Sequence, residues 1–373
     1  MTVVLAPDSF KGSIAAAAAA AALAEGWRSV DPGTAIVPRP MADGGEGTLD
    51  AFAAAIPDAT RVPVTVTGPH GRPLAASWLL LPPTDDAPRG TAVVELASTS
   101  GIELLGSALL PLDAHSLGFG QAIAAALDHG VSRLVLGIGS SASTDGGTGV
   151  LTALGARFTD AAGQAIPLGA RGLDALVAAD LTALRALPGG GALVLSDVTN
   201  PLLGAFGAAA VFGPQKGLGQ SAVIRADAGL RRLAELLPAD PDTPGAGAAG
   251  GVGFALRAWG ARLVPGAAEV AGLIGLPEAL AAASVVVTGE GSFDGQSAAG
   301  KAPTHVGALA AAAGVPVALV AGRITADADT SAFAHAVSLT ELAGSADAAL
   351  ADPARWLRGA GARLAAGGSS PSV

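Results

Sequence analysis

The chain has 373 residues, no cysteine and a formal net charge of −10, with 50 % hydrophobic and 14 % charged residues. Without cysteine, disulfides, thiolate metal sites and cysteine nucleophiles are excluded, and the acidic balance argues against a nucleic-acid surface, which needs a basic patch. The mean hydropathy of +0.52 comes largely from alanine, and the alanine-rich run at residues 14–23 is too short to span a bilayer. No amino-terminal signal pattern is present, so we expect a cytoplasmic protein without a membrane partner.

Short β-branched runs alternate with alanine-rich stretches, which is typical of βα units around a parallel sheet. In chain order, we expect strands at 3–6 and 35–37, with helices at 14–27 and 47–55. Residues 61–81 and 91–97 instead predict antiparallel strands, with a turn at 68–71. Further βα units follow, with helices at 117–128 and 147–155 and strands at 134–138, 193–196, 284–288 and 315–321.

This order of elements predicts two domains, since a single core rarely grows beyond about 250–300 residues. The fold class is α/β: one flavodoxin- or Rossmann-like domain with a parallel sheet, and a second, mixed α/β domain inserted into it. We place the first at residues 1–65 plus 270–366, the second at 66–269, and a disordered tail at 367–373. The Gly/Pro-rich stretch 239–253 is interpreted as a linker, a hinge or a ligand loop.

The first segment with chemical potential is APDSFKGS, residues 6–13, between the first strand and the first helix. Its backbone N–H groups form an anion site supported by the helix dipole, and Ser9 and Lys11 add donors for a carboxylate or phosphate. The simpler alternative is that Ser13 caps the helix and Lys11 is a solvated side chain.

The pattern D-G-G-x-G occurs twice, at Asp43 and at Asp145, each after a predicted strand. The carboxyl ends of strands are where open α/β sheets bind ligands. Asp43, Glu46 and Asp145 are therefore candidates to bind Mg²⁺ or substrate hydroxyls. The alternative is that each aspartate caps the following helix while the glycines make the turn.

Two later segments add candidates. SDVTNPL places Asp197 after a buried strand, where it could act as a general base or metal ligand with Asn200 as its orienting partner. GPQKG presents Lys216 in a tight turn, where it could contact phosphate. The alternatives are a plain Asn-Pro turn and an ordinary surface lysine.

Residues 295–302, GQSAAGKA, match seven of the eight positions of the P-loop pattern, but Ala302 lacks the hydroxyl that ligates Mg²⁺. We expect the preceding strand to end near Thr288, which leaves residues 289–294 before the loop and argues against a P-loop. Glu290, Asp294 and Lys301 instead form a set with two carboxylates for a metal or hydroxyl and one cation for a phosphate.

Taken together, these segments resemble the bacterial glycerate kinase family. The matching stretches, in chain order, are APDSFKGS, MADGGEGT, GIGSSASTDGGTG followed by LGARF, SDVTNPL, GPQKG, PGAGAAGGVG and TGEGSFDGQSAAGKAP. The resemblance implies ATP-dependent, Mg²⁺-assisted phosphorylation of D-glycerate, to 2-phosphoglycerate rather than 3-phosphoglycerate. It also implies an active site between two α/β domains, one of them flavodoxin-like, small-molecule partners only, and a monomer or homodimer.

Given this resemblance, our own hypothesis assigns a role to each candidate. Catalysis falls to Asp197 as base or hydroxyl-orienting acid, together with Lys11 and Asp294. Glycerate is expected to contact Asp8, Ser9, Lys11, Asp43, Ser98 and Asn200. The nucleotide is expected at Ser140, Ser141, Gly146, Gly147, Lys216, Gly289 and Lys301, and Mg²⁺ at Asp145 and Glu290.

The chain departs from the family's usual motifs at three positions: Thr144 replaces an asparagine, Ser292 an arginine and Gln121 an acid. These changes bear on substrate fit. A kinase of another small hydroxy acid and a non-enzymatic regulator that senses sugar acids are the alternative functions. The regulator is disfavoured by the acidic charge and by the lack of a helix-turn-helix extension.

Overall fold

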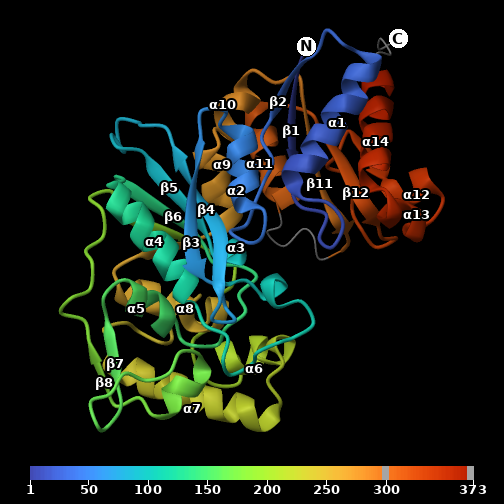
Figure 1. The fold of residues 1–373 in the computed structure, drawn as a ribbon. Helices are drawn as coiled ribbons and strands as arrows, with labels where there is room; N and C mark the ends of the chain where they lie inside the picture. Colours follow the sequence, from blue (N-terminus) through green and yellow to red (C-terminus); the bar gives the residue numbers. More distant parts are fainter. Residues whose placement is uncertain (296–301, 368–373) are drawn as a thin grey trace. The chain divides into compact units, whose positions relative to one another are not determined.

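A computed structural model describes residues 1–295 and 302–367 and shows the α/β architecture that the alternating patterns predict (Figure 1). Its contacts divide the chain into two units. Unit 1 comprises Met1–Ala42, Asp50–Pro57 and Ala267–Val373, and unit 2 comprises Asp43–Leu49 and Asp58–Gly266. The boundary predicted at residue 65 falls inside a strand of unit 2, and the domain limits given above stay a prediction. Gly367 ends a helix, and residues 368–373 lie outside the described residues.

Unit 1 is built on a five-stranded parallel sheet in the order β2-β1-β11-β12-β13. Counted within the unit, this order is 2-1-3-4-5, which is the flavodoxin-like arrangement, so the expectation for this domain is confirmed. The order reverses between β1 and β11, and ligands of such sheets bind at the carboxyl ends of strands at this point. The strands are β1 (Thr2–Pro7), β2 (Ala35–Pro38), β11 (Val285–Phe293), β12 (Val317–Ile324) and β13 (His335–Ser338).

The alanine-rich run of unit 1 belongs to α1 (Ala16–Val30), which packs along α14 (Pro353–Gly367) (Figure 1). A side chain at Gly26 would place its Cβ 1.9 Å from the carbonyl oxygen of Arg358. The small residues therefore serve close helix contact over the sheet core. The other helices of the unit are α2 (Thr48–Ala55), α9 (Gly266–Leu273), α10 (Leu276–Ala281), α11 (Ala302–Ala313), α12 (Leu339–Ala343) and α13 (Ala346–Ala351).

Unit 2 contains a six-stranded sheet in which spatial order follows chain order, β3-β4-β5-β6-β9-β10. β3 (Thr60–Thr67), β4 (Pro73–Leu81) and β5 (Thr91–Glu95) are antiparallel, as predicted. β6 (Arg133–Gly137), β9 (Ala192–Leu195) and β10 (Arg262–Val264) continue the sheet in parallel with β5. A separate hairpin is formed by β7 (Arg157–Thr159) and β8 (Ala178–Asp180).

The helices of unit 2 enclose a core that includes Trp78 and Phe119, both fully buried. They are α3 (Ala97–Ser100), α4 (Leu117–His129), α5 (Thr148–Ala153), α6 (Ala208–Phe212), α7 (Gln220–Leu236) and α8 (Ala248–Ala258). No helix within residues 1–295 and 302–367 is long and apolar enough to cross a membrane.

The Gly/Pro-rich stretch 239–253 is neither a linker nor a hinge between the two units, because it lies inside unit 2 and leads into α8. Ala249, Gly250 and Gly251 take successive left-handed conformations there. A Cβ on Gly250 would lie 2.1 Å from the carbonyl oxygen of Ser143. The Gly250 carbonyl accepts a hydrogen bond from the Gly146 N–H at 3.0 Å, so this turn packs directly on the second D-G-G segment.

The strand expected to end near Thr288 is longer than predicted. β11 continues to Phe293 because residues 289, 290, 292 and 293 pair with β12. The spacing argument against a P-loop was therefore wrong, whereas the missing hydroxyl at Ala302, the first residue of α11, still argues against it. Residues 296–301, which include Lys301, lie outside the described residues.

Candidate active site

Three parallel strands of unit 2 end at the same level, and their last residues are paired: Glu95 with Gly137, and Gly137 with Leu195. The loops that follow therefore begin side by side at one edge of the sheet. Ser98 follows the first strand, Ser140 the second and Asp197 the third. This edge has the position in which open α/β sheets bind ligands.

The first D-G-G segment belongs to this edge. The Gly139 N–H donates to the Gly44 carbonyl at 2.9 Å, and a Cβ on Gly44 would lie 2.6 Å from Leu195. Asp43 is half-buried and accepts a hydrogen bond from the Gly45 N–H at 2.9 Å, as the turn interpretation expects. The segment thus brings Asp43 to the ends of β6 and β9, next to Asp197.

Asp197 is an exposed carboxylate with a fixed orientation. The Gly266 N–H donates to its Oδ1 at 2.7 Å. Gly266 also contacts the first D-G-G segment, since a Cβ there would lie 2.1 Å from the Asp43 carbonyl oxygen. Asn200 donates through Nδ2 to the Phe206 carbonyl at 2.8 Å, which supports the turn interpretation for this residue.

Ser140 adopts a left-handed conformation, with φ of 58°, and its side chain is exposed. A non-glycine residue in this region is strained, and such strain is concentrated at functional sites. Backbone pairing holds the strained residue: the Ile102 N–H donates to the Ser140 carbonyl at 2.8 Å, and the Ala142 N–H donates to the Ser100 carbonyl at 3.1 Å.

Glu95 is a buried carboxylate at this edge that sequence reasoning missed. It is 4 % exposed, and its Oε2 accepts a hydrogen bond from the Leu49 N–H at 3.0 Å. It therefore fixes the end of the Asp43–Leu49 segment. The available signal was a lone acid at the end of the apolar run TAVVE. Nearby, Ser98 donates to the Glu95 carbonyl at 3.2 Å.

The second D-G-G aspartate has a different environment. Asp145 is fully buried and accepts five hydrogen bonds, from the N–H and Oγ–H of Ser116, the Oγ–H of Ser143 and the N–H groups of Gly147 and Gly149. Both carboxylate oxygens are engaged in ordering the entry to α5. This supports the alternative interpretation as a structural cap. Ser141 and Gly146–Gly147 are buried beside it rather than presented to a nucleotide.

Lys216 is not a surface lysine. It is 2 % exposed at the end of a 3₁₀ turn, Pro214–Lys216, and its Nζ donates to the Ser141 Oγ at 2.7 Å and the Ser143 carbonyl at 2.6 Å. Burial lowers the pKa of Lys216 to about 7, against an opposing effect of Asp145. The Lys216 amine thus contacts the protein itself, and the phosphate contact expected of it stays a prediction from the sequence.

Two of the three departures from the family motifs, Gln121 and Thr144, lie in unit 2. The structure shows what Gln121 contacts. Its Oε1 accepts a hydrogen bond from the Thr67 N–H at 2.6 Å. The amide thus supplies the acceptor that a carboxylate would supply. Thr144 is fully buried, and its hydroxyl has no hydrogen-bond partner among the described residues.

His115 is buried next to this network, and burial lowers its pKa despite the opposing charge of Asp145. In the unfolded chain it titrates near pH 6.5. The unfolded state therefore binds more protons as pH falls through that value, and the stability contributed by neutral His115 is lost below about pH 6.5.

We expect His115→Asn to reduce the loss of stability between pH 7.5 and 5.5 by about 1 kcal/mol. The measurement is urea unfolding at each pH. His335→Asn, at an exposed histidine, is the matched control and should keep the wild-type pH dependence. An identical pH dependence in His115→Asn and wild type would contradict the assignment.

In unit 1, the segment after β1 lies at the point where the strand order reverses. The Asp8 N–H donates to the Gly289 carbonyl at 2.8 Å, and the Asp8 Oδ1 accepts a hydrogen bond from the Ser9 N–H at 2.7 Å. Gly289 lies within the sheet and holds this loop in place. Lys11 is exposed, and Asp8 and Ser9 are half-buried. The Phe10 N–H donates to the Ile14 carbonyl at 2.9 Å, so three successive N–H groups of this loop are engaged within the protein, and the anion site at the end of β1 stays a prediction.

The neighbouring end of β11 carries Glu290, Ser292 and Asp294. Glu290 is 9 % exposed, and Asp294 is half-buried. Ser292, where the family's usual motif has arginine, is paired with Arg323 on β12, and the Arg323 Nη2 lies 3.5 Å from the Ser292 Oγ. A guanidinium is therefore present at this edge of the sheet, supplied by the adjacent strand.

The environment of Asp145 does not suit the expected magnesium site, because both of its carboxylate oxygens are engaged by five donors within the protein. Within residues 1–295 and 302–367, no three acidic or histidine side chains gather as a metal-binding group.

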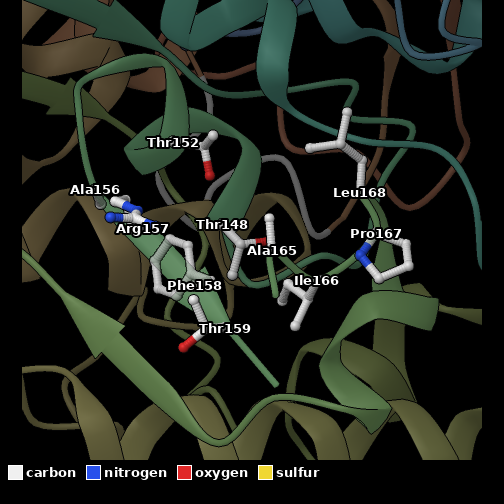
Figure 2. Close-up of a pocket in the computed structure, with 10 residues that line it drawn as sticks. All are labelled: Thr148, Thr152, Ala156, Arg157, Phe158, Thr159, Ala165, Ile166, Pro167 and Leu168. Carbon is white, nitrogen blue, oxygen red and sulfur yellow. The ribbon is translucent and has the colours of Figure 1, made fainter. Parts of the chain in front are cut away.

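A cavity of about 110 Å³ lies elsewhere in unit 2, between α5 and the β7 strand (Figure 2). None of the candidate site residues lines it. Its walls are Thr148, Thr152, Ala156, Arg157, Phe158, Thr159, Ala165, Ile166, Pro167 and Leu168.

Comparison with known proteins identifies the family. The model of the glycerate kinase family matches residues 3–367. The chain belongs to the glycerate kinase family. It is 40 % identical to glycerate 2-kinase of Escherichia coli K12 over 335 residues, covering 88 % of this chain and 86 % of the relative. Glycerate kinase of Bacillus subtilis is 39 % identical over 338 residues, with the same coverage.

A solved structure agrees with this assignment. The crystal structure of putative glycerate kinase 2 from Salmonella typhimurium LT2 has a TM-score of 0.84 and 39 % identity, covering 98 % of both chains. The protein described here is therefore an enzyme, a kinase, with the fold of its family.

Proposed function

We propose that this kinase transfers a phosphoryl group from ATP to D-glycerate and forms 2-phosphoglycerate. The observation that supports this most is the exposed, oriented carboxylate of Asp197, on an edge of the sheet where Asp43 and Ser140 also lie. Phosphoryl transfer needs alignment, charge neutralisation and an acceptor for the hydroxyl proton. Asp197 suits the last of these roles.

In the proposed mechanism, Asp197 accepts the proton of the glycerate hydroxyl as that oxygen attacks the γ-phosphorus. The Gly266 N–H holds one carboxylate oxygen, so the carboxylate does not need to reorganise during the step. Asp43 orients a substrate hydroxyl. The strained Ser140 offers its hydroxyl to the nucleotide.

We assign the binding of anionic groups to the loop that follows β1 in unit 1. The exposed ammonium of Lys11, with the Ser9 hydroxyl as a further donor, binds the glycerate carboxylate or the phosphoryl group in transit. Asp8 shapes this loop by its bond to the Ser9 N–H. We keep Asp294 and Lys301 as catalytic and phosphate-binding candidates; Lys301 lies outside the described residues.

Mg²⁺ is part of the family-based prediction, and it is usually bound through one or two carboxylates together with phosphate oxygens. Because the environment of Asp145 does not suit this role, we assign no step to the metal. Location in the cytoplasm and a monomeric or homodimeric state also remain predictions from the sequence.

The test is a coupled assay of ADP release with D-glycerate, with L-glycerate and without an acceptor. We expect stimulation by D-glycerate. A panel of other small hydroxy acids measured in parallel separates glycerate from the alternative substrates. ADP release that neither glycerate enantiomer stimulates would overturn the proposal, and a higher kcat/KM for another hydroxy acid would favour the alternative kinase.

We also expect Arg323→Ala to lower kcat/KM about 10- to 100-fold, because a lost charged hydrogen bond costs about 1.5–3 kcal/mol. The reason is that Arg323 supplies the guanidinium that the usual motif carries at position 292. The exchange variant Ser292→Arg with Arg323→Ser, which moves the cation back to β11, should recover most of the activity. The arginine has no such role if Arg323→Ala keeps wild-type kcat/KM.

A further inference from the structure

Lys216 combines features that a lysine rarely shows. The residue is 2 % exposed, and its amine donates hydrogen bonds to Ser141 and Ser143, which belong to one loop. Burying an ammonium is costly, and an apolar side chain of similar volume often serves stability equally well or better. The lysine therefore needs an explanation beyond packing.

The loop that Lys216 contacts is the one that carries the strained residue. Residues 140 and 142 are held through their backbone by the segment 100–102. Residues 141 and 143 are held by the Lys216 amine. Four consecutive residues are thus fixed by alternating contacts from two sides. Ser140, with φ of 58°, lies at the start of this set and next to the Ser141 hydroxyl that Lys216 engages.

The surroundings of the amine do not suit direct phosphate binding. Its two acceptors are a hydroxyl and a carbonyl of the loop, and the buried carboxylate of Asp145 lies close enough to affect its charge. A phosphate would have to displace these contacts and reach a side chain that is 2 % exposed. A role exerted through the loop explains the same observations without such a rearrangement.

We propose that Lys216 is a positioning residue: its buried amine holds Ser141 and Ser143 so that Ser140 keeps its left-handed conformation at the edge of the active site. The catalytic consequence rests on the proposed function, whereas the effect on the loop does not. Lys216 acts on the reaction only through Ser140 and makes no contact with substrate or nucleotide.

The first test is independent of activity. Hydrogen exchange is measured at the Ile102 and Ala142 amides, which pair with the loop, in wild type, Lys216→Met and Gln215→Met. Gln215 is the exposed neighbour on the same turn and serves as the matched control. We expect at least about 10-fold faster exchange at both amides in Lys216→Met and no change in Gln215→Met. Unchanged exchange in Lys216→Met would overturn the proposal.

The second test is a double-mutant cycle in ADP formation with Lys216→Met, Ser140→Gly and the double variant. Glycine takes the left-handed conformation without support. The kcat of the double variant should therefore be no lower than the kcat of the less active of the two single variants. Multiplicative losses would show that Lys216 acts independently of Ser140 and would overturn the proposal.

Ser141→Ala, which removes one acceptor of the amine, gives the same two readouts if Lys216→Met does not fold. We expect it to accelerate exchange at Ala142 and to lower kcat, and wild-type values for both would count against the proposal. If wild type forms no ADP with glycerate while the exchange result holds, the proposed function fails and the positioning role of Lys216 stands.

Discussion

Replacement of Asp197 by asparagine is expected to lower kcat about 10²- to 10⁴-fold, the usual contribution of a general base. The fold should survive, because the asparagine Oδ1 can still accept the hydrogen bond from the Gly266 N–H that Asp197 accepts at 2.7 Å. Steady-state kinetics with D-glycerate and ATP, next to a thermal unfolding curve, measure both effects.

Asp240→Asn is the matched control for this substitution. Asp240 is also in unit 2 and accepts a backbone hydrogen bond in a turn, from the Asp242 N–H at 2.9 Å, and it is not one of the candidate site residues. It should keep wild-type turnover. A folded Asp197→Asn protein with a kcat within about threefold of wild type would remove Asp197 as the base.

Replacement of Asp145 by alanine is expected to destabilise the protein by about 3–5 kcal/mol, the usual effect of removing one partner from a buried ionic network. Five donors would lose their acceptor in a fully buried place. Urea or thermal unfolding measures the loss.

Asp160→Ala gives the comparison for Asp145→Ala. Asp160 accepts hydrogen bonds from the Ala162 and Gln164 N–H groups in an exposed turn, so its loss should cost only about 1 kcal/mol. If Asp145→Ala instead unfolds like wild type and its activity needs a much higher Mg²⁺ concentration, Asp145 is a metal ligand and the structural assignment is wrong.

The two D-G-G segments show where sequence reasoning reached its limit. Both have the same pattern after a strand, and both were expected at the ends of strands. Asp43 is half-buried at the site, whereas Asp145 is enclosed by donors, two of which come from Ser116, 29 residues earlier in the chain. No local pattern contains such a distant partner.

Elements with strong local signals were predictable. The alternation of β-branched and alanine-rich runs gave the parallel strands, and the turn at 68–71 gave the antiparallel pair. The end of β11 was not predictable, because its glycines resemble a loop until pairing with β12 is known. The pairing of β1 with β11, which joins residues 282 positions apart, likewise depends on the whole fold.

The environment of a single side chain was hardest to predict. Lys216 follows Gly-Pro-Gln, a sequence typical of an exposed turn, yet its amine is buried against a loop about 75 residues earlier. Glu95 was missed because its partner is a backbone N–H from the Asp43–Leu49 segment. In both cases a contact distant in sequence decides the role of the residue.

The most direct test of the proposed activity is ³¹P NMR of a reaction containing the enzyme, ATP, Mg²⁺ and D-glycerate. The proposal predicts a phosphate monoester that appears as the γ-phosphate signal of ATP decays, with the chemical shift of 2-phosphoglycerate, and that is absent when the acceptor is omitted. Only inorganic phosphate, or no change in the ATP signals, would contradict the proposal that this kinase phosphorylates D-glycerate.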